Sequence, residues 1–144
     1  MILLDTTMLV YAVGVDHPLR DPARALFARI RDGDVRATTT LEALQEFAHV
    51  RARRRSRSDA AALAKAFGVS LSPLLRLEEV DLLEGLELFS STSALGPFDA
   101  VLASAARRRD WAVASADRAF GDVAGLRALD PSDPSFIDQV RATR

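Results

Sequence analysis

Short apolar runs alternate along the chain with longer segments in which apolar residues recur every three or four positions. The short runs are typical of buried strands, and strands are predicted at residues 2–4, 35–38, 111–114 and 126–129. The stretch from 69 to 77 contains Pro73 and a weaker pattern, and a further short strand is predicted there at residues 74–77. These runs predict a sheet whose strands are separated by helical segments.

The longer segments have the apolar spacing and the end signals of helices. Helices are predicted over residues 8–12, 23–31, 41–54, 58–68, 79–89 and 98–109. Thr6 and Thr7 are expected to cap the first of them. The residues of the fifth helix that are expected to face inward are Val80, Leu83, Leu86 and Leu88. Because strands that alternate with helices form βαβ units, the predicted fold class is α/β, a three-layer α/β/α sandwich around a central, mainly parallel sheet.

Length and composition predict one globular domain over residues 1–144. Hydrophobic residues make up 49% of the chain and charged residues 27%, which excludes a disordered or collagen-like protein. The absence of cysteine excludes disulfides, zinc–thiolate and iron–sulfur sites and a cysteine nucleophile. No apolar run approaches the roughly 20 residues of a membrane span, and the chain begins without a basic leader, so a soluble cytoplasmic protein is expected.

The net charge of −1 conceals one dense cationic cluster between residues 51 and 57. Its members are Arg51, Arg53, Arg54, Arg55 and Arg57. A near-neutral protein cannot coat nucleic acid over its whole surface, but such a cluster is able to hold a phosphate backbone locally. The structural alternative is a solvated helix end, where cations interact favourably with the helix carboxyl terminus.

Four acidic residues stand where a parallel sheet would bring them together. Asp5 and Asp117 follow predicted strands. Asp99 lies in the first turn of one predicted helix, and Glu46 lies within another. Ligands of open parallel sheets bind outside the carboxyl ends of the strands, so these side chains are able to converge. Taken singly, Asp99 also fits a helix cap, Asp117 a turn residue and Glu46 a solvated helix position, so the pattern carries more weight than its members.

A convergent set of carboxylates indicates metal chemistry. Carboxylates that converge repel one another, and such a cluster persists if some acids are protonated or a cation is shared. With no cysteine and two histidines, the available ligands are hard oxygens, which suit Mg²⁺ or Mn²⁺. A divalent ion held in this way binds a phosphate oxygen and activates water, so the predicted chemistry is phosphodiester hydrolysis.

Four segments, in order, resemble the motifs of the PIN-domain family and, within it, the VapC-type toxins of bacterial and archaeal toxin–antitoxin pairs. The opening Ile-Leu-Leu-Asp-Thr-Thr-Met-Leu-Val-Tyr resembles the first motif, with Asp5 as its acid and Thr7 as its hydroxyl residue. The segment Thr-Thr-Thr-Leu-Glu-Ala-Leu-Gln-Glu-Phe-Ala-His-Val is similar to the second motif and places its glutamate at Glu46. This part of the resemblance covers the first third of the chain.

The third and fourth motifs lie in the last third of the chain. Gly-Pro-Phe-Asp-Ala-Val-Leu-Ala resembles the third, with Asp99 as its acid. Ala-Ser-Ala-Asp-Arg-Ala-Phe resembles the fourth, with Asp117 as its acid and Ser115 as the hydroxyl that supports it. The resemblance thus extends over almost the whole chain.

The resemblance implies a parallel sheet flanked by helices and an acidic pocket that binds Mg²⁺ or Mn²⁺ and cleaves single-stranded RNA. The catalytic and metal-binding residues that it implies are Asp5, Glu46, Asp99 and Asp117. It also implies a homodimer and a small cognate antitoxin that inserts a segment near the pocket. The candidate RNA contacts are then Arg51, Arg53, Arg54 and Arg55, with an antitoxin contact as the alternative.

Other functions agree less well with the residues. A response-regulator receiver needs a second acid beside Asp5 and a lysine after a late strand, whereas Lys65 lies within a predicted helix. A haloacid-dehalogenase-like phosphatase needs an aspartate where Thr7 stands. His17 and His49 are expected to be structural or solvated rather than an acid–base pair. A PIN-fold RNA-binding or RNA-processing module that is not a toxin stays as the alternative function.

Overall fold

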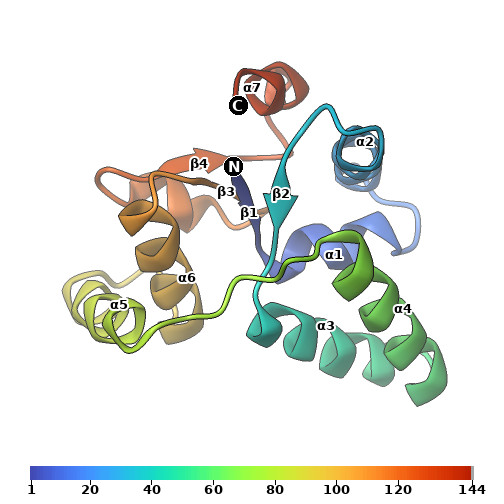
Figure 1. The fold of residues 1–144 in the computed structure, drawn as a ribbon, viewed down its shortest axis with the longest axis horizontal. Helices are drawn as coiled ribbons and strands as arrows, with labels where there is room; N and C mark the ends of the chain where they lie inside the picture. The colour runs from blue at the N-terminus through green and yellow to red at the C-terminus, as the bar shows by residue number, and fades with distance from the viewer. Residues whose placement is uncertain (144) are drawn as a thin grey trace.

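The computed structural model describes residues 1–143, and its centre is a four-stranded parallel sheet (Figure 1). The strands are β1 (Ile2–Leu4), β2 (Ala37–Thr38), β3 (Ala112–Ala114) and β4 (Arg127–Leu129), in the spatial order β2-β1-β3-β4. The central strand β1 pairs with both β2 and β3, and β4 pairs with β3. Because every pairing is parallel, the carboxyl ends of the strands meet at one edge of the sheet.

Helices cover both faces of this sheet. Ile2 and Leu4 belong to an apolar cluster with residues of α1 (Thr6–Ala12), α2 (Arg20–Arg31) and α7 (Phe136–Ala142). Leu3, on the opposite face of β1, joins a second cluster with residues of α6 (Pro97–Arg108). Successive side chains of a strand point to opposite faces, so even a three-residue strand contributes to both clusters. The predicted three-layer α/β/α fold with a parallel sheet is confirmed.

Two helix pairs extend beyond the sheet. Helix α3 (Leu41–Arg54) packs against α4 (Arg57–Ser70), and the rings of Phe47 and Phe67 meet edge-to-face at 5.2 Å between centroids. Helix α5 (Glu79–Ser91) packs against α6, and a short 3-10 helix, η1 (Arg118–Asp122), follows β3. In Figure 1 the two pairs flank the end of β1. No helix within residues 1–143 is long and apolar enough to span a membrane.

The strand predicted at residues 74–77 is wrong. Leu75 makes a single parallel bridge with Thr40, and the segment is otherwise irregular between α4 and α5. Pro73 has no N–H group to donate to a ladder. The carbonyls of Leu71 and Pro73 instead accept hydrogen bonds from the Thr38 hydroxyl, at 3.0 and 2.9 Å. The Leu75 N–H donates one backbone hydrogen bond of 2.9 Å to the Thr39 carbonyl, so pairing at this edge of the sheet is limited to a single bridge.

The inward face predicted for residues 79–89 is wrong at two leucines, although Leu88 packs against the second apolar cluster and Val80 is half-buried. Leu83 and Leu86 are 55% and 42% exposed, whereas Asp81 and Gly85 are buried. A Cβ atom added to Gly85 would lie 2.6 Å from the Val101 Cα, so α5 approaches α6 through its glycine. A close backbone approach buries the residues nearest the contact and leaves the bulky leucines outside it.

The ends of the chain hold two smaller differences. Asp5, rather than a threonine, caps α1, since its side chain accepts hydrogen bonds from the backbone N–H groups of Thr6 and Thr7. The sequence analysis assigned no element after residue 129, where the structure has α7. Phe136 and Val140 of this helix are buried in the first apolar cluster, so α7 completes the cover of that face of the sheet.

Candidate active site

Asp5 is held by hydrogen bonds at the carboxyl end of β1. It is 5% exposed, and its Oδ1 accepts a hydrogen bond of 2.7 Å from the Thr6 N–H. Its Oδ2 accepts hydrogen bonds from the hydroxyls of Thr7, at 2.8 Å, and Ser115, at 2.7 Å. A carboxylate with this many donors keeps one orientation. Ser115 comes from the end of β3, so the pairing of β1 with β3 brings the two together.

Asp117 lies two residues after Ser115 and is joined to the same network. Its backbone N–H donates to the Ser115 hydroxyl at 3.0 Å, while the Ala116 N–H donates to the Thr7 hydroxyl at 3.0 Å. The side chain of Asp117 is exposed and accepts a hydrogen bond of 2.9 Å from the Ala119 N–H, which caps η1. The predicted turn role of Asp117 is therefore present, and it places this carboxylate beside the end of β3.

Glu46 comes from α3, and a hydroxyl of α1 holds it at the site. The Thr6 hydroxyl donates a hydrogen bond of 2.6 Å to the Glu46 Oε2. Because the N–H of the same threonine binds Asp5, Thr6 connects the two carboxylates. The sequence analysis named Thr6 only as a helix cap. The signal available there was a second hydroxyl directly after the strand-end aspartate.

Asp99, in the first turn of α6, faces the other three carboxylates. The pKa of Asp99 is raised to about 6. Burial is the largest cause, and the negative charges of Asp5, Asp117 and Glu46 add to it. The charges of Asp5, Asp117 and Glu46 therefore lie near enough to Asp99 to raise its pKa.

No cationic side chain neutralises this cluster within residues 1–143. None of the ion pairs there includes Asp5, Glu46, Asp99 or Asp117. In the same part of the chain, no three His, Asp or Glu side chains are grouped so that together they could hold a metal ion. An open set of hard oxygens nevertheless fits Mg²⁺ or Mn²⁺, because Mg²⁺ keeps several waters and needs only one or two direct carboxylates. The donor chemistry and the uncompensated charge thus suit a divalent cation.

Three of the four acids, Asp5, Glu46 and Asp99, line a groove of about 780 Å³, whereas Asp117 is not among its lining residues. One wall is polar and comes from α3, with Glu42, Gln45 and His49; the other is largely apolar and comes from α5 and α6, with Leu82, Leu86 and Phe98. The sequence pattern did not predict this groove, since its walls come from segments more than thirty residues apart.

The two histidines do not form an acid–base pair in this groove. His49 is exposed and lines it, one turn after Glu46 on α3. His17 is not among the residues that line the groove; its ring stacks on Tyr11 at 4.6 Å, and its Nδ1 accepts a hydrogen bond from the Leu19 N–H. The structural role expected for His17 agrees with these contacts.

The arginine cluster divides into an internal and an exposed part. The Arg51 Nε donates to the Asp59 Oδ2 at 2.6 Å, and its Nη1 donates to the Val13 carbonyl at 3.1 Å, so Arg51 joins α1, α3 and α4. Arg53, Arg54 and Arg55 are exposed at the carboxyl end of α3. Of the candidate RNA contacts, only these three present their side chains to solvent.

Comparisons with known proteins agree with the fold. A family model described as PIN domain matches residues 2–126, a range that includes all four acidic residues. The chain is 52% identical over 139 residues to Ribonuclease VapC7 of Mycobacterium tuberculosis, which covers 95% of this chain and 96% of that protein. It is 35% identical over 112 residues to Ribonuclease VapC23 of the same species, covering 76% of this chain and 86% of that protein. The chain therefore belongs to the PIN-domain family.

Proposed function

We propose that this chain is a divalent-metal-dependent endoribonuclease that acts in the cytoplasm as the toxin of a type II toxin–antitoxin module. The observation that carries the proposal is the raised pKa of Asp99, which is about 6. Burial is its largest cause, and the charges of Asp5, Asp117 and Glu46 contribute to it. A protein that maintains such repulsion without a cationic side chain nearby has a use for an external cation.

The relatives support the choice of substrate. The similar proteins VapC7 and VapC23 are named as ribonucleases, and the first of them aligns with almost the whole chain. Their names assign the VapC type, to which the resemblance of the four motifs also leads. RNA is therefore the substrate that we infer for the groove, and a cognate antitoxin is the inferred protein partner.

The four carboxylates would hold Mg²⁺ or Mn²⁺ at the floor of the groove. A divalent ion, when bound there, polarises a phosphoryl oxygen and makes a bound water more acidic. Thr7 and Ser115 fix the orientation of the Asp5 carboxylate through its Oδ2, and Thr6 holds the Glu46 Oε2. These hydroxyls position the ligand oxygens before any substrate arrives, which reduces reorganisation during the reaction.

Residues outside the groove bear on the partners. Arg53, Arg54 and Arg55 are exposed at the carboxyl end of α3 and are not among the residues that line the groove; they are the proposed phosphate contacts, because arginine pairs with phosphate in a fork geometry. Leu83 and Phe89 of α5 are 55% and 41% exposed and support the proposed homodimer, since apolar residues of this size are usually covered.

Cleavage assays with the Asp5→Asn variant test the proposal. A single-stranded RNA should be cleaved by the wild-type chain with Mn²⁺, should be intact with EDTA, and should be intact with the variant. The variant keeps its size but loses the charge that helps to bind a cation, so circular dichroism should show an unchanged fold.

The matched control is Asp138→Asn, which removes an exposed aspartate from α7, far along the chain from the site. Its cleavage should equal that of the wild type. Cleavage by Asp5→Asn at the wild-type rate would refute the proposed site. RNA cleavage without growth arrest on expression would support the RNA-processing alternative instead of the toxin.

A further inference from the structure

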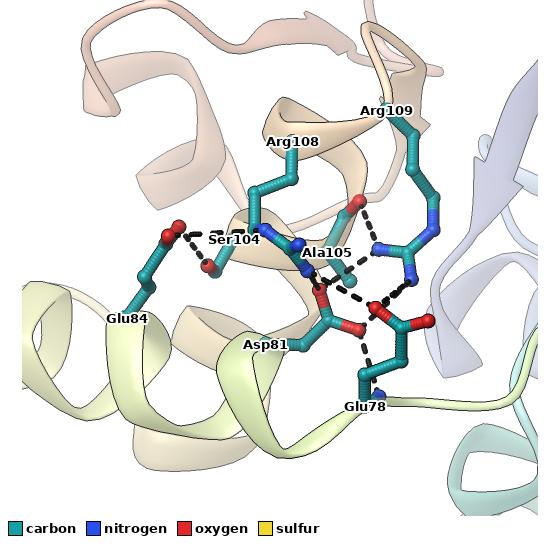
Figure 2. Close-up of polar contacts among 7 residues, drawn as sticks. All are labelled: Glu78, Asp81, Glu84, Ser104, Ala105, Arg108 and Arg109. Carbon is teal, nitrogen blue, oxygen red and sulfur yellow. Dashed lines mark hydrogen bonds and ion pairs between the residues drawn. The ribbon is translucent and has the colours of Figure 1, made fainter.

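A fifth carboxylate, Asp81, is buried between α5 and α6 and is not part of the acidic cluster of the groove. It is 0% exposed, yet it has a full set of partners (Figure 2). Its Oδ1 accepts hydrogen bonds from Arg108, at 2.6 Å, and from Arg109, at 2.8 Å. Its Oδ2 accepts hydrogen bonds from Arg109, at 3.0 Å, and from the Glu78 N–H, at 2.9 Å. Asp81 thus ties the start of α5 to the end of α6.

The charges around Asp81 form a closed network that we name the α5 latch, made of Glu78, Asp81, Arg108 and Arg109. The Glu78 side chain lies 3.5 Å from Arg108 and 3.7 Å from Arg109. Burial alone would raise the pKa of Asp81, but hydrogen bonds from Arg109, the Glu78 backbone and Arg108 lower it to about 2. Asp81 is therefore ionised at neutral pH, where it attracts both arginines of the α5 latch.

Gly85 gives a second reason why α5 lies where it does. It is one turn after Asp81, and a Cβ atom there would lie 2.6 Å from the Cα and 2.7 Å from the Cγ2 of Val101. The two helices are therefore in backbone contact. Helix α5 makes its extensive contacts with α6, so the α5 latch and this glycine determine its position.

The same helix forms one wall of the groove. Leu82 and Leu86 line the groove from α5, and Glu78 and Glu79 line it at the start of the helix. Glu78 thus belongs to the α5 latch and to the groove at once. A shift of α5 relative to α6 would change the width of the groove and would release the Glu78 charge from its two arginines, next to the path of a polyanion.

We propose that Asp81 is a positioning residue for RNA binding, which acts through the α5 latch by holding the α5 wall and the Glu78 side chain in place. The proposal rests on the proposed ribonuclease function of the groove. Helix α6 does not depend on the latch in the same way, because Ala100, Ala103 and Ala106 are 0% exposed in the apolar cluster against the sheet. Asp99 should therefore keep its place when the latch is broken.

The test compares Asp81→Asn with Glu84→Gln by steady-state cleavage of a fluorescein-labelled single-stranded RNA with Mn²⁺. Glu84 also touches the network, at 3.8 Å from Arg108, but it does not line the groove (Figure 2). Asp81→Asn should raise KM at least fivefold, with kcat within twofold of the wild type and with unchanged Mn²⁺ binding. Glu84→Gln should leave KM unchanged. A purely structural role would lower the folded fraction, and so the apparent kcat, without a change in KM.

A second pair of variants reaches the same wall by another route. Gly85→Ala must move the α5 backbone away from Val101 and should also raise KM. Gly68→Ala is the matched control, because Gly68 also lies within a helix, α4, where the nearest atom to an added Cβ is the Leu44 Cδ1 at an ordinary 3.6 Å. This variant should leave KM and kcat unchanged.

Hydrogen exchange separates this proposal from the ribonuclease proposal. In Asp81→Asn the amides of α5 should exchange faster than in the wild type, while those of the first turn of α6 should not change. An unchanged KM in a folded Asp81→Asn variant, unchanged exchange in α5, or a parallel loss of Mn²⁺ binding would each overturn the positioning role. A wild-type chain that cleaves no RNA with Mg²⁺ or Mn²⁺ would refute the ribonuclease, whatever α5 does.

Discussion

The two carboxylates at opposite ends of the α5–α6 pair, Asp81 and Asp99, show how neighbours decide the state of a buried acid. Asp81 accepts hydrogen bonds from Arg108 and Arg109, and its pKa falls to about 2 although burial opposes this. Asp99 has burial and three further carboxylates around it, and its pKa rises to about 6. The first arrangement joins two helices, whereas the second keeps negative charge available for a cation.

The difference has opposite consequences for stability. Removing the charge of Asp81 leaves Arg108 and Arg109 without their buried partner, which destabilises the fold. Removing the charge of Asp99 relieves repulsion that the folded chain otherwise retains. We infer that repulsion among the acidic residues lowers the stability of the metal-free chain. The α5 latch stabilises α5 and α6, the second of which bears Asp99.

Asp99→Asn should produce the largest effect. Cleavage of RNA should fall by about 10³-fold, the loss typical of removing one electrostatic contributor to a transition state. In the absence of metal, the same variant should unfold at a higher temperature than the wild type, because the amide is not repelled by Asp5, Glu46 or Asp117. Gel-based cleavage and thermal denaturation in EDTA measure the two effects. A variant that is both inactive and less stable would mean that the carboxylates of this site do not repel one another.

Asp81→Asn should change stability in the opposite direction. Breaking a buried pair by neutralising one partner should lower the free energy of unfolding by about 3 kcal/mol. Urea denaturation at pH 7 measures this change, with Glu84→Gln as the control that should differ from the wild type by less than about 1 kcal/mol. Equal stability of wild type and Asp81→Asn would show that the α5 latch contributes nothing to the fold.

The pH dependence of the metal-free protein should show both carboxylates in separate ranges. The folded-state pKa of Asp99 lies above its ordinary value, so the folded chain binds more protons between about pH 4 and pH 6, and stability should rise by about 1 kcal/mol from pH 7 to pH 5. The folded-state pKa of Asp81 lies below its ordinary value, so its contribution should be lost as the pH falls from about 4 to 2. Denaturation in EDTA across pH 2–8 measures both changes in stability, the upper limb of the curve between pH 7 and pH 5 and the lower limb below about pH 4.

Mn²⁺ supplies the control for the upper limb. Bound metal favours the ionised form of the acidic cluster, so saturating Mn²⁺ should abolish the rise in stability between pH 7 and pH 5. The lower limb should persist in full in Asp99→Asn and become smaller in Asp81→Asn, where a part remains because the pKa values of Asp59 and Asp133 are lowered as well. A single limb common to both variants would contradict the assignment of the two ranges.

Much of the fold was predictable from local pattern. Ile2, Leu3 and Leu4 are all fully buried, as expected of a short apolar run that forms a buried strand before an aspartate. The prediction failed where tertiary contacts outweigh periodicity. Leu83 and Leu86 have helical spacing but lie outside the helix contact, because Gly85 meets Val101. The segment after Pro73 is apolar but does not form the predicted strand. The carbonyls of Leu71 and Pro73 accept hydrogen bonds from the Thr38 hydroxyl.

The α/β class, the family and the order of the four acidic residues follow from the sequence, because strand ends, helix starts and motif spacing are local properties of a chain. The environment of each of those acids depends on the tertiary structure. The pKa of Asp99 depends on charges that lie as far away in sequence as Asp5, and the pKa of Asp81 depends on arginines at the end of another helix. Electrostatic energy depends on distance and burial in space, and neither can be obtained from the spacing of residues along the chain.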